Sequence, residues 1–152
     1  MAKAPTYEGY GSDTPVADAA KTLVTSLATE AFARLPSALR GEDVRAVHDA
    51  RVALRRLRAA MQTFRTCFPR KRWKVQRRAT RRIARALGGV RDADVHLAAL
   101  RGVLGGAEAR ERSGVTYAIE ALAARRRRAL ATFAVELSQF DREGLGHIVA
   151  DA

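Results

Sequence analysis

Two series of side chains recur at helical spacing between Val47 and Phe68, and they lie next to each other. At 100° per residue, the apolar series keeps an a/d heptad register over three repeats, as packing seams do. The apolar series comprises Val47, Ala50, Leu54, Leu57, Met61, Phe64 and Phe68. The basic series comprises His48, Arg51, Arg55, Arg58 and Arg65. The pattern predicts a bundle helix whose core face runs beside a cationic face, with Arg45 and Arg56 on its back.

The helix expected next in the chain repeats this arrangement. Its basic face comprises Lys74, Arg77, Arg78, Arg81, Arg82 and Arg85. Like charges at i, i+4 each cost a few tenths of a kcal/mol, and no acid stands four residues away to relieve them. Solvated surface faces usually mix charges of both signs, so a simple solubility role is the weaker reading. Arginine also grips phosphate oxygens through a planar fork, which favours an anion site.

The net charge of the chain is +12, and it is concentrated in the middle. From Arg45 to Arg91 there are sixteen Lys or Arg residues and one acid, Asp49. This segment therefore carries more than the whole net charge. Such a balance predicts affinity for a polyanion, which could be nucleic acid, polyphosphate or an anionic membrane surface.

The composition narrows the classes of protein further. The single Cys67 excludes an internal disulfide framework and a cysteine-based zinc cluster. We see no signal peptide and no apolar run long enough to span a bilayer, so we expect a cytoplasmic protein without a membrane partner. Apolar residues make up 47% and aromatic residues only 6%, which suits packed helices.

The positions of proline and glycine between the helical patterns predict an all-α, four-helix bundle over residues 14–142, with tails at 1–13 and 143–152. We expect a first helix capped by Asp13 or Thr14, opened by Pro15 and ended near Leu35 by Pro36. The next expected helices span about 43–68 and about 71–87, with a further piece at 91–104 after an interruption at "GGV". The last expected helix begins at about Ala107 or Ser113 and ends at Phe140.

Two residues allow more than one interpretation. Arg126 falls within the apolar stripe of the last helix, which comprises Val115, Ile119, Leu122, Phe133, Leu137 and Phe140. Because a buried unpaired arginine is very costly, Arg126 either snorkels to solvent or points into a wet, anion-filled space. His48 is either a packed helical histidine or, in line with Arg51 and Arg55, a donor to an anion. Trp73 is expected in the core.

Two motifs resemble those of the CHAD domains (conserved histidine α-helical domains). "VHDARVALRRLRAAMQTF" is similar to the H-x-x-R-x-x-x-R-R-L-R helix of that family, and "LGGVRDADVHLAAL" to its L-G-x-x-R-D-x-D-V-x-x-L motif. The resemblance covers about residues 43–104. It implies an all-helical domain that binds inorganic polyphosphate in a basic pore, is not itself an enzyme, and is associated with polyphosphate or polyester storage granules.

The resemblance also assigns individual residues. It carries the anion-binding role to His48, Arg51, Arg55, Arg56 and Arg58, although the helical wheel places Arg56 on the back. From the second motif it points to Arg91, Asp92 and Asp94, whose acids we expect to cap a helix and orient arginines. The complete expected polyphosphate-binding set is His48, Arg51, Arg55, Arg58, Arg65, Lys74, Arg77, Arg78, Arg81, Arg82, Arg85, Arg91 and Arg126.

Typical CHAD domains are about twice this long and contain two similar four-helix halves. This chain resembles one half, since His147 is not followed by the arginine pattern. Either two copies form a homodimer that rebuilds the two-fold pore, or the chain is a fragment of a longer protein. We favour the homodimer, because a cationic stripe beside an apolar seam suits a symmetric interface.

Two further function classes compete with polyphosphate binding. A nucleic-acid-binding protein could use the same charge, but single-strand binders interleave aromatic residues for stacking, and the basic faces have almost none. Catalysis on phosphoanhydrides would need carboxylates to hold metal ions, and Asp49, Asp92 and Asp94 are too few and too scattered. We therefore expect no catalysis, no cofactor and no metal, with weak nucleic-acid binding as a side activity.

Overall fold

A computed structural model describes residue 11 and residues 13–142, and it is all-α. Its long helices are α1 (Val16–Arg40), α2 (Val44–Thr63), α3 (Arg70–Gly106) and α4 (Ala109–Arg142), with a 3-10 turn η1 (Arg65–Cys67) between α2 and α3. The expected fold class and its four main helices are confirmed. The tails expected at 1–13 and 143–152, with His147, fall almost wholly outside the described residues.

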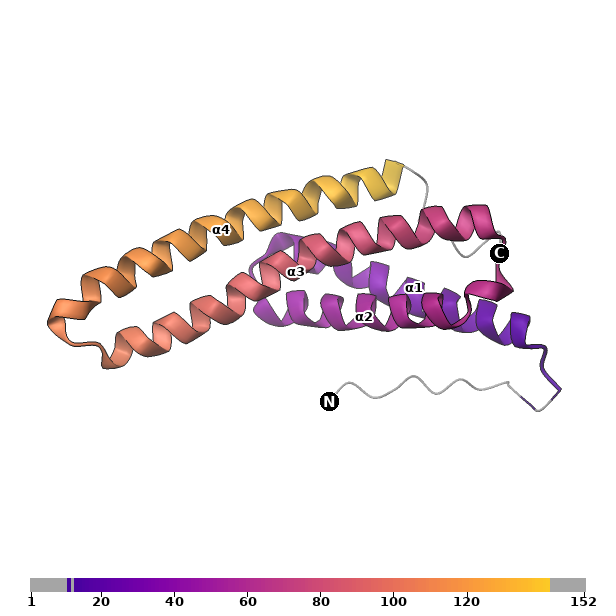
Figure 1. Cartoon of the computed structure of the whole chain (residues 1–152), viewed down its shortest axis with the longest axis horizontal. Helices are drawn as coiled ribbons and strands as arrows, with labels where there is room; N and C mark the ends of the chain where they lie inside the picture. Colours follow the sequence, from indigo (N-terminus) through magenta and orange to yellow (C-terminus); the bar gives the residue numbers. More distant parts are fainter. Residues whose placement is uncertain (1–10, 12, 143–152) are drawn as a thin grey trace.

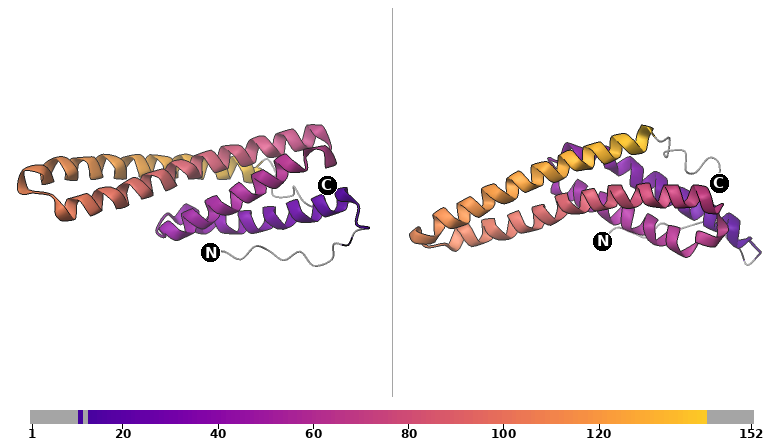
Figure 2. Two further views of the ribbon diagram at one scale, coloured as in Figure 1. Left: turned by 60° about the horizontal axis from the view of Figure 1, so that its bottom comes forward. Right: turned by 45° about the horizontal axis from the view of Figure 1, so that its top comes forward.

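The helices form two antiparallel hairpins of unequal length. The hairpin of α1 and α2 packs against one half of the longer α3–α4 hairpin, and the other half projects beyond it (Figures 1 and 2). Between Leu97 and Phe133 no side chain is buried, which agrees with this projection. The anchored half of the long hairpin therefore holds the core of the domain.

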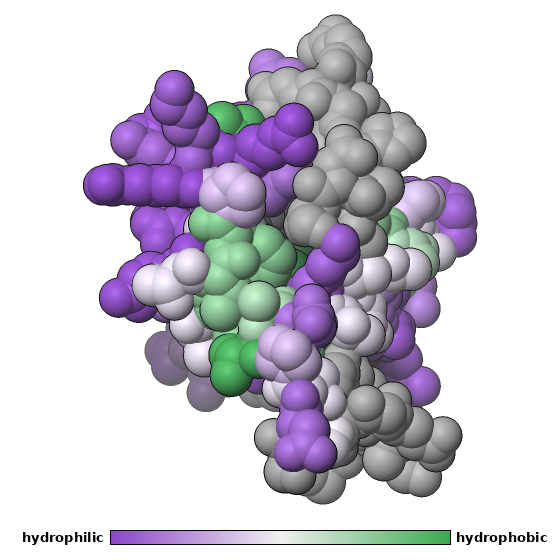
Figure 3. All heavy atoms as spheres, turned by 90° about the vertical axis from the view of Figure 1, so that its right-hand side faces the viewer, coloured by the Kyte–Doolittle hydropathy of each residue, from purple (hydrophilic) through white to green (hydrophobic). Residues whose placement is uncertain are grey.

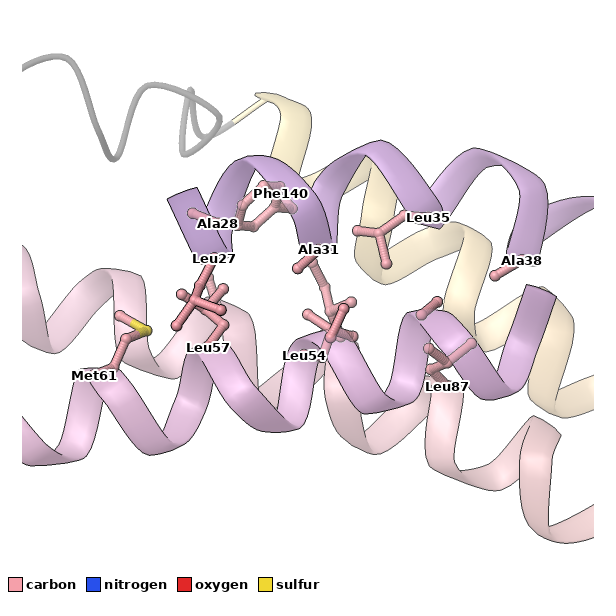
Figure 4. Packing of buried hydrophobic residues seen from close by; sticks show 14 of the residues in the cluster. Leu27, Ala28, Ala31, Leu35, Ala38, Leu54, Leu57, Met61, Leu87 and Phe140 are labelled. Carbon is pink, nitrogen blue, oxygen red and sulfur yellow. The ribbon is translucent and has the colours of Figure 1, made fainter. Parts of the chain in front are cut away.

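The core lies where the two hairpins meet. Five of the seven expected seam residues are buried, namely Val47, Ala50, Leu54, Leu57 and Met61. From α1, Leu27, Ala31 and Leu35 point toward them, and Phe140 of α4 reaches the same layer (Figure 4). The seam predicted from periodicity is thus confirmed for α2, apart from Phe64 and Phe68, which are partly buried where the helix has ended.

Pro36 does not end the first helix, and the predicted end near Leu35 was wrong. The helix continues to Arg40, because one further turn buries Ala38 and the ring of Pro36 lies on the exposed face. Gly41 then closes it with φ +69°, and its N–H donates to the carbonyl of Ala38. At the other end Pro15 occupies the N-cap, so the predicted side-chain cap by Asp13 or Thr14 is absent.

The predicted interruption at Gly88 and Gly89 was also wrong, because α3 is continuous through both. Leu87, Val90 and Ala93 keep one buried face across the site, and this burial outweighs the low helix propensity of the two glycines. A Cβ at Gly89 would lie 3.5 Å from that of Ala129, which is an ordinary van der Waals contact, so α4 packs close to α3 at this point.

The connection between α2 and α3 is a tight corner held by aromatic side chains. The second helix ends at Thr63 rather than near Phe68, and Phe68 turns back to stack on Trp73 with ring centroids 4.0 Å apart. The buried indole Nε1 of Trp73 donates to the carbonyl of Met61, 3.1 Å away. This bond satisfies a carbonyl in the last turn of α2 and fixes where α3 begins. The expected core position of Trp73 is confirmed.

Candidate anion-binding site

A pocket of about 460 Å³, here called the central pocket, lies between α2 and α3. Both helices contribute basic side chains to it because they run antiparallel and their predicted basic faces meet there. From α2 the lining includes His48, Arg51, Arg55 and Arg58, and from α3 Arg81, Arg85 and Gly88. The structure therefore brings together residues that the sequence placed on two separate helical wheels.

The cations of the central pocket have no internal counter-charge. His48, Arg51, Arg55, Arg58, Arg81 and Arg85 are all exposed. Within the part of the chain that the structure describes, no hydrogen bond or ion pair engages any of them. Five guanidiniums around one pocket repel each other, and a bound anion would relieve that repulsion.

His48 and Val52 also line a second pocket of about 570 Å³, here called the flanking pocket. Its other lining residues include Arg45, Asp49, Arg56 and Arg91. The two pockets share the lining residues His48 and Val52 and so lie side by side along α2, and together they are here called the basic depression. The single acid, Asp49, is exposed at this end and offsets part of the charge.

Arg56 and Arg45 are functional candidates that the helical wheel missed. The wheel placed both on the back of the helix, whereas Arg56 is half-buried and both line the flanking pocket beside Arg91. Because α3 continues without a break past Gly88, Arg91 reaches the face of α2 that carries Arg45 and Arg56. The motif resemblance, which includes Arg56, was the one signal in the sequence that could have found it.

A third pocket of about 580 Å³, here called the corner pocket, lies at the α2–α3 connection. It takes three of the predicted site residues, Arg65, Lys74 and Arg77, away from the central pocket. Arg77 is held there by a hydrogen bond from its Nη1 to Oε1 of Gln62, 2.7 Å away. The other lining residues are Thr66, Phe68, Arg70 and Trp73, and the sequence had not singled out Thr66 or Arg70.

Three predicted cations, Arg78, Arg82 and Arg126, line none of these three pockets. Arg82 donates from Nε to Oε2 of Glu136 on α4, 2.9 Å away, and this ion pair is partly buried. The prediction that Arg82 belongs to the anion-binding face was therefore wrong. The ion pair between Arg82 and Glu136 connects α3 to α4. Arg78, one helical position from Arg77, is exposed outside the three pockets.

Arg126 neither snorkels nor points into an anion-filled space. Its Nε donates to Oδ1 of Asp94, 2.5 Å away, and its Nη2 donates to the carbonyl of Gly41, 2.8 Å away. Both alternatives predicted for Arg126 are therefore replaced by a partly buried ion pair with a side chain on α3. This residue has a structural partner and lines none of the three pockets.

The two acids of the second motif, Asp92 and Asp94, differ in their surroundings. Asp94 orients Arg126, as expected of an acid in that motif, but it caps no helix because α3 runs through it. Its Oδ2 is buried without a hydrogen-bond partner among the described atoms. Asp92 is exposed.

The described residues hold no group of three or more His, Cys, Asp or Glu side chains that could bind a metal ion. No helix among them is long and apolar enough to cross a membrane. The three pockets are instead lined by guanidinium, ammonium and imidazole groups, which bind oxyanions by charge-assisted hydrogen bonds.

Comparison with known proteins gives one match. The family model described as "CHAD domain" matches residues 22–145, which includes most of all four helices and every residue that lines the three pockets. No curated protein and no solved structure matches the chain.

Proposed function

Because the chain belongs to the CHAD family, whose members are linked to polyphosphate-related proteins, we propose that it binds inorganic polyphosphate without catalysing a reaction. The binding site is the basic depression formed by the central and flanking pockets. The anion contacts come from His48, Arg51, Arg55 and Arg58 on α2 and from Arg81, Arg85 and Arg91 on α3.

One observation carries this proposal: two helices present cations to the same pocket, and among the described residues no hydrogen bond or ion pair engages these side chains. Within the central pocket, successive cations on each helix are three or four residues apart, which spaces them by about 4.5–6 Å along the axis, and Arg91 follows Arg85 after six residues. A flexible polyanion with a charge on every repeat can satisfy such a row. A small isolated anion would leave most of the row uncompensated.

Polyphosphate fits the lining better than nucleic acid does. None of the residues that line the central or flanking pocket is Phe, Tyr or Trp, so the imidazole of His48 is the one ring there on which a base could stack. Phosphate contacts dominate the affinity of basic proteins for nucleic acid and depend strongly on salt. Nucleic-acid binding is therefore the alternative function, and we expect it to be weak at physiological salt.

The proposal extends to the place where the protein acts and to its oligomeric state. A polyphosphate receptor without an active site suits attachment to polyphosphate or storage granules in the cytoplasm. The central pocket is open to solvent on one side, and a second copy of the chain facing it would close a pore around the anion. Light scattering with polyphosphate present should then give a molar mass of twice 16.6 kDa.

A competition titration tests the function. Long-chain polyphosphate, single-stranded DNA and duplex DNA compete at equal phosphate concentration and physiological salt for the wild-type protein. We expect polyphosphate to displace the other two and its affinity to fall steeply as salt rises. Equal affinity for DNA would overturn the proposal in favour of nucleic-acid binding.

A double variant tests the site. Arg51→Ala with Arg55→Ala removes two exposed cations that have no internal partner, so the melting temperature should not fall. Polyphosphate affinity should drop at least about tenfold. The matched control is Arg125→Ala with Arg128→Ala, which removes the same charge from exposed positions on α4 that line none of the three pockets. Equal losses in both variants would mean that net charge, not this site, sets the affinity.

A further inference from the structure

We propose that the corner pocket is a second anion subsite, so that one polyphosphate chain spans it and the central pocket and long chains bind more tightly than short ones. This inference rests on the proposed function and adds a chain-length preference to it. The corner pocket shares no lining residue with the central pocket, and its volume, about 580 Å³, is larger.

The basic rows of the two helices run through both pockets. On α3 the row continues from Arg85 and Arg81 in the central pocket to Arg77, Lys74 and Arg70 in the corner pocket. Each step is three or four residues, so these side chains share one face over about 22 Å of helix. The α3 row therefore offers a continuous track from one pocket to the other.

The basic residues of α2 also lead from the central pocket to the corner pocket. Their numbers rise along this path while those on α3 fall, because the two helices run antiparallel. The α2 row passes from Arg51, Arg55 and Arg58 in the central pocket to Arg65 in the corner pocket. Gln62 occupies the one uncharged position in this row, and it bonds to Arg77 on the facing helix. The Gln62–Arg77 contact thus marks the boundary between the two subsites.

The corner pocket carries its own unsatisfied positive charge. Arg65, Arg70 and Lys74 are exposed, and among the described residues no hydrogen bond or ion pair engages them. The first turn of α3 lies in the same lining, so the positive end of a long helix dipole adds to their field. Figure 3, which faces this end of the molecule, shows hydrophilic side chains projecting around a small apolar patch.

The aromatic residues of the corner pocket favour a phosphate chain over a nucleotide. Trp73 is 6% exposed, its indole N–H is bonded to Met61, and one face of its ring stacks on Phe68 at an interplanar angle of 2°. The ring of Trp73 is therefore not an open platform, and Phe68 has one face covered by it. A ligand at this site is held by its phosphates and not by a stacked base.

Occupying two subsites with one chain raises affinity by effective concentration. Once one pocket holds a phosphate segment, the next segment reaches the other pocket without a second loss of translational freedom. Tripolyphosphate, which is too short to span the row of about 22 Å, gains nothing from this. We therefore expect two tripolyphosphate molecules per chain, and a single site of much higher affinity for long-chain polyphosphate.

Isothermal titration with tripolyphosphate and with long-chain polyphosphate tests this inference in three forms of the full chain. These are the wild type, the corner variant Arg70→Ala with Lys74→Ala, and the control Arg125→Ala with Arg128→Ala. The corner variant should bind one tripolyphosphate instead of two and should lose at least about tenfold in long-chain affinity. The control should keep both values. The melting temperature of each variant, measured first, establishes that it is folded.

The outcomes separate the two proposals. If the wild type fails to prefer polyphosphate over DNA, the proposed function is wrong. If the wild type binds polyphosphate but the corner variant behaves like the control, the second subsite is wrong and the function stands. A corner variant that loses affinity for single-stranded DNA while keeping its long-chain polyphosphate affinity would also overturn the subsite as assigned here.

Discussion

Arg126 on α4 and the buried Asp94 on α3 form an ion pair, with Nε of the partly buried guanidinium 2.5 Å from Oδ1 of the carboxylate. The same guanidinium reaches the carbonyl of Gly41, so one side chain joins three segments of the chain. The side chain of Asp94 is only 2% exposed, and a carboxylate in that position is costly without its cation.

We expect Arg126→Ala to lower the free energy of unfolding by about 3–5 kcal/mol, as measured by urea denaturation. Arg34→Ala is the control, since it removes an exposed i, i+4 pair with Glu30 and should cost at most about 0.5 kcal/mol. Replacing both partners, Asp94→Leu with Arg126→Leu, should cost less than Arg126→Ala alone. A small loss for Arg126→Ala would contradict a structural role for the pair.

The uncompensated cations of the central pocket should make the unliganded protein more stable as salt rises. Chloride salts screen the repulsion among Arg51, Arg55 and Arg81, so raising KCl to about 0.5 M should increase the free energy of unfolding. Polyphosphate affinity should fall over the same range. Denaturation and titration across one KCl series check both. Stability that falls with KCl would show that attractive surface pairs outweigh this repulsion.

Gly88 forms part of the central pocket and has space beside it, since a Cβ there would meet nothing within 4 Å. Gly88→Leu should therefore stabilise α3 by up to about 1 kcal/mol through helix propensity. It should also weaken polyphosphate binding, because the leucine side chain occupies space in the pocket. Gly102→Leu is the matched control on the same helix, also in open space, and should add stability without changing affinity.

Gly41 should tolerate a side chain poorly, mainly because of its left-handed backbone conformation and also because Leu130 would have to shift. Its φ is +69°, and a Cβ would lie 2.7 Å from Cδ2 of Leu130. We expect Gly41→Ala to lower the free energy of unfolding by about 1–3 kcal/mol. Thermal denaturation beside Gly105→Ala, at an open helical position that should become more stable, measures the difference. Equal melting temperatures would show that α1 and α4 separate there without cost.

The packing face of α2 could be read from the sequence because it depends only on spacing within one helix. Val47, Leu54 and Met61 recur at seven-residue intervals, and all three are buried. The same reasoning placed His48, Arg51 and Arg55 together, and they line one pocket. Local periodicity was sufficient wherever a residue's surroundings are set by its own helix and one neighbour.

Periodicity was not sufficient where distant segments decide the outcome. Pro36 and Gly88 are poor helix residues, yet burial of the next turn keeps both helices intact. Arg126 and Arg82 find acids 32 and 54 residues away, on helices whose packing no single wheel contains. On the wheel of α2 alone, Arg56 lies on the back of the helix. In the fold it lines a pocket with Arg91, because α3 continues past Gly88.

The length of α3 gives the two ends of one helix different dynamics. Near Trp73 its amides lie in a packed body, whereas beyond Leu97 they have only α4 beside them and no buried side chain to protect them. Hydrogen exchange should therefore follow a gradient along α3, with protection close to that of global unfolding in the anchored turns and rapid local opening toward Gly105 and Gly106. We therefore expect the outer turns of the hairpin to unfold as a separate, weaker unit while the helices around the basic depression stay folded.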